Sequence, residues 1–261
     1  MKDINYILIR YPSYFEIIDY RNQHKDNISM EKVYDNYNNL LNILSEEDIK
    51  YYFLNTEKGP SEVFTRDIGF SLEGTLFVCK LKNKHRKTET KNLLEHIRKN
   101  RLKYYEFENE IEGGDVVIGN SKIFVGLSQR TSEEAISELE QYLEDIGSKY
   151  KVIPIRFDSV SKLHLDCVFN ILDKKSAIVC DYIYDIETIE KEFKNLYYVS
   201  KKSADNLGIN IISLDKKRVI CSDTEATRVL RKNGYKVLQC EYDEIIKSGG
   251  GIGCSTLPIR I

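Results

Sequence analysis

The chain has 261 residues, of which 39 are basic and 41 acidic, giving a formal net charge of −2. This balance excludes a global electrostatic field that would recruit nucleic acid or an anionic membrane. The sequence contains no apolar run near the roughly eighteen residues of a membrane span and no secretory signal. Its six cysteines lie singly, without a C-x-x-C pair or clustering with the four histidines. We therefore expect a soluble, cytoplasmic chain with reduced thiols, no metal and no cofactor.

The first part of the chain alternates β-rich and helical segments. Apolar runs and their spacing predict strands at 6–11, 51–54, 63–72 and 75–81, and helices at 29–47 and 89–99. Glu73 and Gly74 separate two of these strands and predict a hairpin turn.

A pattern of hairpin, helix and strand then recurs. The copies comprise 115–118, 123–127, 132–146 and 152–157; 167–172, 177–180 and 186–193; and 209–214, 219–221, 223–233 and 236–240. Such a unit cannot bury both faces of its sheet alone, so several units should pack around a common centre. The sequence contains no Pro-, Gly- or Ser-rich linker, which favours one α/β domain over 1–261 with its loops gathered at one mouth.

Four short polar stretches lie at the edges of predicted strands. They are F-T-R-D at 64–67, E-G-G-D at 112–115, L-H-L-D at 163–166, and the glycine-rich segment S-G-G-G-I-G-C that ends at Cys254. Turns at strand edges can point side chains into one space. The common position of the four stretches beside strands therefore predicts that they form one site.

Two of these stretches carry a thiol and a histidine. Taken alone, Cys254 is more typical of a buried, packed cysteine than of a nucleophile. His164 lies between two leucines, so in a strand it would share a face with Asp166, which would hold one tautomer and make it a general acid/base.

The remaining candidates are charged. Glu112 precedes two glycines that equally suit a plain turn. Asp67 lies within an apolar stretch and needs a partner, for which either Arg66 or a cationic ligand would serve. Arg86 and Arg130 are interpreted as surface charges or as a cradle for a carboxylate. A thiol, a histidine and several carboxylates together favour covalent catalysis on a guanidinium or amidinium carbon.

In their order along the chain, the four stretches resemble the guanidine-modifying superfamily of arginine deiminases, dimethylarginine dimethylaminohydrolases and amidinotransferases, from about Tyr51 onward. The resemblance implies a five-bladed α/β propeller of ββαβ units, the pentein fold. It also implies Cys254 as nucleophile, His164 as general acid/base and Glu112 as the acid that holds the histidine. The substrate, a small guanidino cation, would be bound by four further residues: Asp67, Asp166, Arg86 and Arg130.

The resemblance implies hydrolysis through a covalent thiouronium, giving citrulline and an amine or ammonia. Chain length favours a dimethylargininase, whereas Asp166, and Ser61 where dimethylargininases carry aspartate, favour an arginine deiminase. Gly253 stands where deiminases commonly carry histidine. Amidinotransfer and a non-catalytic ribosome anti-association role are the alternatives, and the sequence leaves the oligomeric state, including a homodimer, open.

Overall fold

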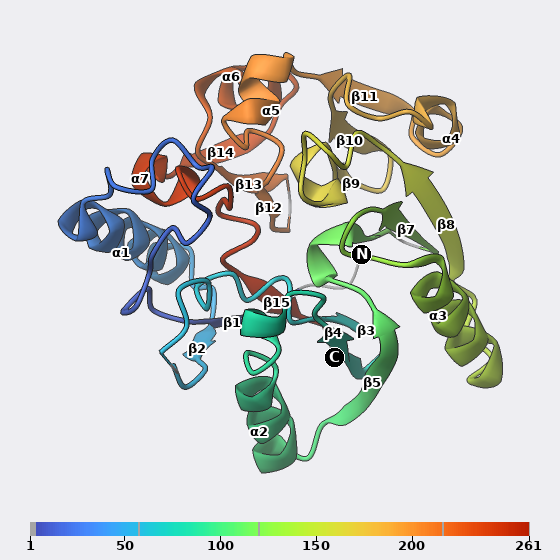
Figure 1. Ribbon diagram of the computed structural model, residues 1–261. Helices are drawn as coiled ribbons and strands as arrows, with labels where there is room; N and C mark the ends of the chain where they lie inside the picture. The colour runs from blue at the N-terminus through green and yellow to red at the C-terminus, as the bar shows by residue number, and fades with distance from the viewer. Residues whose placement is uncertain (1–3, 57, 120, 216, 261) are drawn as a thin grey trace.

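The computed structural model describes residues 4–56, 58–119, 121–215 and 217–260. In this part of the chain, the strands form five sheets of three strands each, arranged around one axis (Figure 1). The first strands of all five sheets line one hollow of about 60 Å³, which marks that axis. The five-bladed α/β propeller expected from the sequence is therefore confirmed.

Four sheets are built in the same way. The first strands are β3 (Gly69–Leu72), β6 (Val116–Ile118), β9 (Phe169–Asp173) and β12 (Ile212–Ser213). The middle strands, antiparallel to the first, are β4 (Thr75–Lys80), β7 (Lys122–Leu127), β10 (Ser176–Val179) and β13 (Arg218–Cys221). The third strands, parallel to the middle ones, are β5 (Lys103–Glu110), β8 (Lys151–Arg156), β11 (Asn195–Tyr198) and β14 (Lys236–Gln239).

A helix connects the middle strand to the third strand in each of these units, as a parallel pair requires. These helices are α2 (Lys91–Asn100), α3 (Glu133–Asp145), α4 (Ile186–Glu190) and α6 (Thr224–Lys232). Short helices complete the chain: α5 (Lys201–Asp205), α7 (Asp243–Ile246), and the 3₁₀ turns η1 (Lys84–Arg86), η2 (Gly113–Asp115) and η3 (Leu165–Cys167).

The fifth sheet joins the two ends of the chain. Its middle strand is β1 (Tyr6–Ile9), which is followed by α1 (Met30–Glu46) and the parallel strand β2 (Tyr51–Phe53). Its first strand is β15 (Leu257–Ile259), which runs antiparallel to β1 near the C-terminus (Figure 1). Pro258 is tolerated because β15 is an edge strand. The last unit of the propeller is therefore closed by pairing between the two termini.

Local sequence explains where several elements begin and turn. The side chains of Ser29, Ser132 and Asp223 accept hydrogen bonds from backbone N–H groups in the first turns of α1, α3 and α6. Glu73 and Gly74 both have positive φ, of 48° and 78°, as the predicted hairpin turn requires.

Some predicted elements differ from the structure. The strand expected over 63–72 begins only at Gly69, because residues 63–68 form turns beside the Cys254 segment. The stretch around His164 leads into η3 and is not a strand. The helix expected over 186–193 ends at Glu190, and β5, β11, α5 and α7 have no counterpart among the predicted elements. Asn120 lies between the predicted strands 115–118 and 123–127, and Lys216 between 209–214 and 219–221; these two residues lie outside the described residues.

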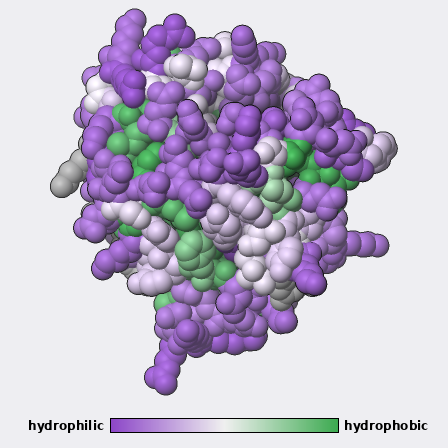
Figure 2. All heavy atoms as spheres, turned by 90° about the vertical axis from the view of Figure 1, so that its left-hand side faces the viewer, coloured by the Kyte–Doolittle hydropathy of each residue, from purple (hydrophilic) through white to green (hydrophobic). Residues whose placement is uncertain are grey.

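Apolar side chains pack between the sheets and the helices in three buried clusters. The face seen in Figure 2 is mostly hydrophilic, with apolar side chains in small separate areas. Within the described ranges, no helix is long and apolar enough to cross a membrane. One domain over 1–261 stays a prediction.

Candidate active site

Each of the five units contributes a buried polar residue just before its first strand. Asp67 precedes β3, Glu112 precedes β6, His164 precedes β9, Asn210 precedes β12 and Cys254 precedes β15. These segments lie at one end of the propeller axis, where η2 and η3 pack against one another. The fold thus brings together residues that are far apart in the sequence, as the backbone hydrogen bond from Arg66 N to Cys254 O (2.9 Å) shows.

His164 is held by Glu112. Nε2 of His164 lies 2.9 Å from Oε2 of Glu112, and both side chains are almost fully buried. Gly114 is needed here because a Cβ at this position would lie 2.5 Å from Nδ1 of His164. The structure places Glu112 within hydrogen-bond distance of His164. The prediction that His164 shares a strand face with Asp166 is wrong, because His164 directly precedes a 3₁₀ turn that contains Asp166.

Asp67 is paired with Arg86. Nη1 of Arg86 donates to Oδ2 of Asp67 at 2.7 Å, while its other nitrogens contact the carboxylate of Glu89 at 2.8 and 2.9 Å. Arg66, one of the two partners considered from the sequence, is therefore not the residue that pairs with Asp67 here. The other oxygen, Oδ1, lies 3.6 Å from Nδ1 of His164. Neither of these two buried atoms has a hydrogen-bond partner among the described residues.

The Cys254 segment is held by Asn210. Backbone N–H groups of Cys254 and Gly253 donate to the side-chain and main-chain oxygens of Asn210 at 3.0 and 3.3 Å. A Cβ at Gly251 would lie 2.7 Å from Oδ1 of Asn210, so this close approach requires glycine. Asn210 was missed from the sequence. The feature that could have indicated Asn210 is a single amide side chain within the apolar run 207–212. It lies just before the first strand of its unit, as the site residues of the other four units do.

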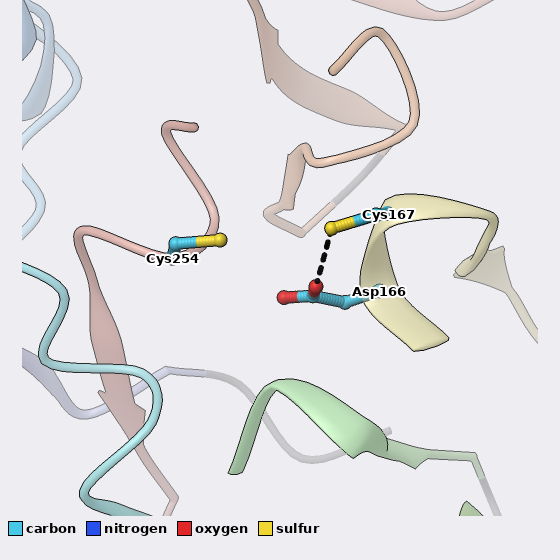
Figure 3. Close-up of side chains that lie close together, drawn as sticks. All are labelled: Asp166, Cys167 and Cys254. Atoms are coloured by element: carbon cyan, nitrogen blue, oxygen red, sulfur yellow. Dashed lines mark hydrogen bonds between the residues drawn. The ribbon is translucent and has the colours of Figure 1, made fainter. Parts of the chain in front are cut away.

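Asp166 and Cys167 lie across from Cys254 (Figure 3). The thiol of Cys167 donates to Oδ1 of Asp166 at 3.5 Å. The two sulfur atoms and a carboxylate oxygen all lie within 4.8 Å of one another, and all three residues are buried. Cys167 was not a candidate from the sequence, because it is close to Cys254 only in the folded chain.

The ionisation of these groups is linked. Interaction with the thiol of Cys167, and then with His164, lowers the pKa of Cys254 to about 6 despite its burial. Burial lowers the pKa of His164, but interactions with Asp67, Cys254 and Glu112 outweigh burial and raise this pKa well above its ordinary value. Glu112 is also buried, yet His164, Arg86 and Arg130 lower its pKa to about 2. The arrangement therefore favours a thiolate beside an imidazolium.

The pKa of Asp166 is shifted upward, in the opposite direction to that of Glu112. Burial and the neighbouring Cys254 raise the pKa of Asp166 well above its ordinary value. His164 and Arg66 lower this pKa only in part, and among the described residues no salt bridge joins Asp166 to a cation as Arg86 is joined to Asp67. A bound cation beside Asp166 would therefore favour its ionised form.

Asp115, the last residue of E-G-G-D, ties three segments together. Oδ2 accepts from the hydroxyl groups of Ser128 and Thr131 at 2.6 and 2.7 Å, and Oδ1 accepts from the backbone N–H of Leu165 at 3.0 Å. Leu165 follows His164 directly. The carboxylate thus fixes the backbone that carries the histidine.

A cavity of about 790 Å³ opens onto the site. Asp67, Arg86, Arg130 and Cys167 are among the residues that line it. Arg130 contacts Oε1 of Glu112 at 3.3 Å and keeps a fifth of its side chain exposed. Arg86 is buried and already bonded to two carboxylates. Of the two predicted arginines, Arg130 is thus the one that retains exposed surface at the cavity.

The family description "N,N dimethylarginine dimethylhydrolase, eukaryotic" matches residues 16–261. The chain belongs to this family. The match begins 35 residues before the resemblance noted in the sequence, and it confirms the expectation of a hydrolase of the dimethylargininase and arginine deiminase class.

Relatives with known sequences support this placement. The uncharacterized protein YkgA of Bacillus subtilis (strain 168) is 31% identical over 240 residues, covering 90% of this chain and 82% of that protein. The arginine deiminase of Oenococcus oeni is 26% identical over 251 residues. The chain spans only 60% of the length of that deiminase.

Solved structures agree with the fold. The N-terminal domain of ArgZ, an arginine dihydrolase from Cyanobacteria solved with product, superimposes with a TM-score of 0.88 at 20% identity. The match covers 98% of this chain and 97% of that domain. A mutant dimethylarginine dimethylaminohydrolase of Pseudomonas aeruginosa in complex with citrulline gives a TM-score of 0.85 at 20% identity, covering 98% and 99% of the two chains.

Proposed function

We propose that the chain hydrolyses the guanidino group of arginine or an Nω-methylated arginine, giving citrulline and ammonia or an amine. The observation that carries this proposal is the placement of Cys254, His164 and Glu112 beside two further buried carboxylates, Asp67 and Asp166. A thiol protease needs one orienting acid or amide, whereas this excess of acid suits a cationic substrate.

The two aspartates would bind the guanidinium. Oδ1 of Asp67 is buried, and neither this atom has a hydrogen-bond partner nor Asp166 a salt bridge within the described residues. A planar guanidinium presents N–H donors along its edges, which match carboxylate oxygens. Bound in this way, its carbon would lie in front of Cys254, and its charge would stabilise the thiolate and the ionised form of Asp166.

The reaction proceeds in two halves. The Cys254 thiolate attacks the guanidinium carbon, and His164 gives its proton to the departing nitrogen as the C–N bond breaks. This leaves a covalent thiouronium on Cys254. A water molecule then attacks the same carbon and gives a proton to His164. Collapse of this second tetrahedral species breaks the C–S bond, restores the thiolate and releases the ureido product, while the remaining hydroxyl proton passes to solvent.

Glu112 is the positioning residue for the histidine in both halves. Its hydrogen bond to Nε2 of His164 leaves Nδ1 facing Asp67. Because Glu112 stays ionised, it favours the imidazolium needed for the first proton transfer.

Unmethylated arginine is the substrate that the pocket favours. A dimethylated nitrogen has no N–H to donate, so a carboxylate facing it would be left buried without a partner. Asp166 lies in such a position beside Cys254. Arg130, at the cavity wall, would bind the carboxylate end of the amino acid, as the exposed part of its guanidinium allows.

Amidinotransfer and a non-catalytic role in ribosome anti-association are the competing functions. A transferase requires an amine acceptor in place of water, and a non-catalytic protein has no use for a buried thiol of lowered pKa next to a histidine of raised pKa. The set of ionisable side chains therefore favours hydrolysis.

Purified protein incubated separately with arginine, monomethylarginine, dimethylarginine and agmatine tests the proposal by colorimetric measurement of ureido product. We expect product from arginine, and none above background with Cys254→Ala. Cys180→Ala, which removes a buried thiol elsewhere, is the matched control and should retain turnover. Product from dimethylarginine alone would overturn the substrate argument. Absence of product from all four, together with haloacetamidine labelling of Cys254 that His164→Ala leaves unchanged, would overturn the enzymatic proposal.

A further inference from the structure

Arg66, the arginine of the F-T-R-D stretch, has no role in the proposed reaction. It directly precedes Asp67, yet Asp67 is paired with Arg86. Arg66 and Asp166 both line the axial hollow of about 60 Å³, whereas Arg66 does not line the 790 Å³ cavity. Its side chain therefore approaches the site from the propeller axis, and not from the side that is open to substrate.

Arg66 contacts the backbone on both sides of the Cys254 Cα. Its backbone N–H donates to the carbonyl oxygen of Cys254 at 2.9 Å, and Nε of its side chain donates to the carbonyl oxygen of Gly253 at 3.3 Å. These two carbonyls belong to the peptide groups that flank the Cα of the nucleophile. Because peptide groups are planar, holding both of them fixes the direction of the Cα–Cβ bond. These contacts complement those of Asn210, which binds N–H groups of the same segment.

The backbone of Arg66 is itself held by the second unit of the propeller. The N–H of Gly113 donates to the carbonyl oxygen of Asp67 at 3.0 Å, and a Cβ at Gly113 would lie only 2.2 Å from the carbonyl oxygen of Arg66. This close approach requires glycine at position 113. The E-G-G-D stretch therefore supports the F-T-R-D stretch, which in turn supports the Cys254 segment.

The guanidinium of Arg66 adds a positive charge to a site that is rich in acid. Burial lowers the pKa of Arg66, while Asp166, Cys254 and Asp67 act in the opposite direction, and Arg66 in turn lowers the pKa of Asp166. The titratable groups that interact with Cys254 are Arg66 and Asp67 before β3, His164, Asp166 and Cys167 around η3, and Tyr242 before α7. The cations among these groups are His164 and Arg66. His164 loses and regains a proton in the proposed reaction, whereas an arginine keeps its charge throughout.

We propose that Arg66 is a positioning residue for the nucleophile: its hydrogen bonds fix the peptide groups that flank the Cys254 Cα, and its permanent charge stabilises the Cys254 thiolate. The role in turnover rests on the proposed hydrolysis, but the effect on the thiol does not, because it is present in the protein without substrate. The F-T-R-D stretch thus contributes two charges with different partners, Arg66 for the nucleophile and Asp67 for the guanidinium.

Alkylation of Cys254 by iodoacetamide, a neutral reagent, measures the thiolate without binding of a cation. The labelling rate is followed over a pH series by mass spectrometry of the Cys254 peptide. Arg66→Met removes the charge and the Nε donor, and it should raise the wild-type midpoint of about 6 by about one pH unit, since a nearby opposite charge lowers a pKa by about 1–3 units. Arg66→Lys keeps the charge and should reverse most of this shift. Arg98→Met, at an exposed arginine of α2, is the matched control and should behave like the wild type.

An unchanged midpoint in Arg66→Met would overturn the proposal. An equal upward shift in Arg66→Lys would also overturn it, because loss of packing and not loss of charge would then account for the shift. If Arg66→Met does not fold, Arg66→Gln removes the charge while keeping a side-chain donor, and it should show the same upward shift. Labelling requires no turnover, so failure of the role of Arg66 is distinguishable from failure of the proposed hydrolysis. Where turnover is present, kcat/KM should fall in Arg66→Met and recover in part in Arg66→Lys.

Discussion

At the scale of single residues, the ionisation of Cys254 depends on side chains from two other units. Its thiolate is favoured by interactions with Cys167 and His164 and disfavoured by burial and by Asp67. The cationic imidazole is in turn favoured by Asp67 and Glu112. In this negatively charged site, the thiolate form of Cys254 is therefore stabilised mainly by His164 and by the thiol of Cys167.

The pH dependence of alkylation tests this coupling. Because the pKa of Cys254 is lowered to about 6, the rate of labelling by a small haloacetamidine should fall as the pH drops through about 6 and be level at neutral pH. His164→Ala should move the midpoint upward, toward the ordinary thiol value of about 8.5. Mass spectrometry of labelled peptides, with EDTA present and Cys254→Ala as the blank, identifies the residue. A wild-type midpoint near the ordinary thiol value would contradict the proposed ion pair.

At the scale of elements, Asp115 joins η2, the turn after β7 and η3. Its carboxylate accepts three hydrogen bonds and lies against Gly126, where a Cβ would be 2.7 Å from Oδ1. Burial nevertheless raises the pKa of Asp115 to about 6, although its hydrogen-bond donors act in the opposite direction. The carboxylate is thus both a required acceptor and a costly buried charge.

Replacement of Asp115 separates these two roles. Asp115→Ala leaves buried donors unpaired and should lower the free energy of unfolding by about 3 kcal/mol, with a loss of turnover through displacement of His164. Asp115→Asn keeps an acceptor for Leu165 and should be milder. Urea unfolding measures the change in stability, and product assays measure the change in turnover. Equal stability of Asp115→Ala and the wild type would show that the three hydrogen bonds to the Asp115 carboxylate are dispensable.

Comparison of the wild type with Asp115→Asn also predicts the direction in which the free energy of unfolding changes with pH. The folded pKa of about 6 exceeds the ordinary value of 3.8, so the contribution of protonated Asp115 is present below 3.8 and is lost as the pH rises through about 6. The wild type should therefore lose on the order of 3 kcal/mol relative to Asp115→Asn between these pH values. A pH-independent difference would contradict the raised pKa.

At the scale of the whole molecule, β15 closes the propeller and positions the nucleophile at the same time. Leu257 and Ile259 are fully buried, and the strand pairs with β1 directly after the Cys254 segment. The apolar residues after Cys254 thus form an edge strand, whose loss would also expose the edge of β1.

Deletion of residues 257–261 should consequently abolish activity and strongly destabilise the fold, since each buried side chain contributes about 1.5–3 kcal/mol. Leu257→Ala and Ile259→Ala keep the chain length and should each cost about 2–5 kcal/mol. Val160→Ala, at a side chain that is 84% exposed, is the control and should stay within about 0.5 kcal/mol. Full turnover and native stability of the truncated chain would contradict the role of β15.

Local patterns determined much of this protein. Helical spacing predicted α1, the recurring pattern predicted α3 and α6, and Glu73-Gly74 predicted its hairpin, because these features depend on neighbouring residues alone. The four polar stretches predicted the positions before β3, β6, β9 and β15. Their order along the chain also indicated the superfamily and the propeller.

Only the tertiary structure decided which side chains meet. Arg86, not Arg66, pairs with Asp67, and His164 does not share a strand face with Asp166. Asn210 supports the Cys254 segment. Cys167 faces the nucleophile, and β15 pairs with β1. No local pattern encodes these contacts, because they join residues from different units and are set by how five sheets pack around one axis. The sequence thus determined which residues carry the chemistry, and the closure of the propeller decided how they are paired.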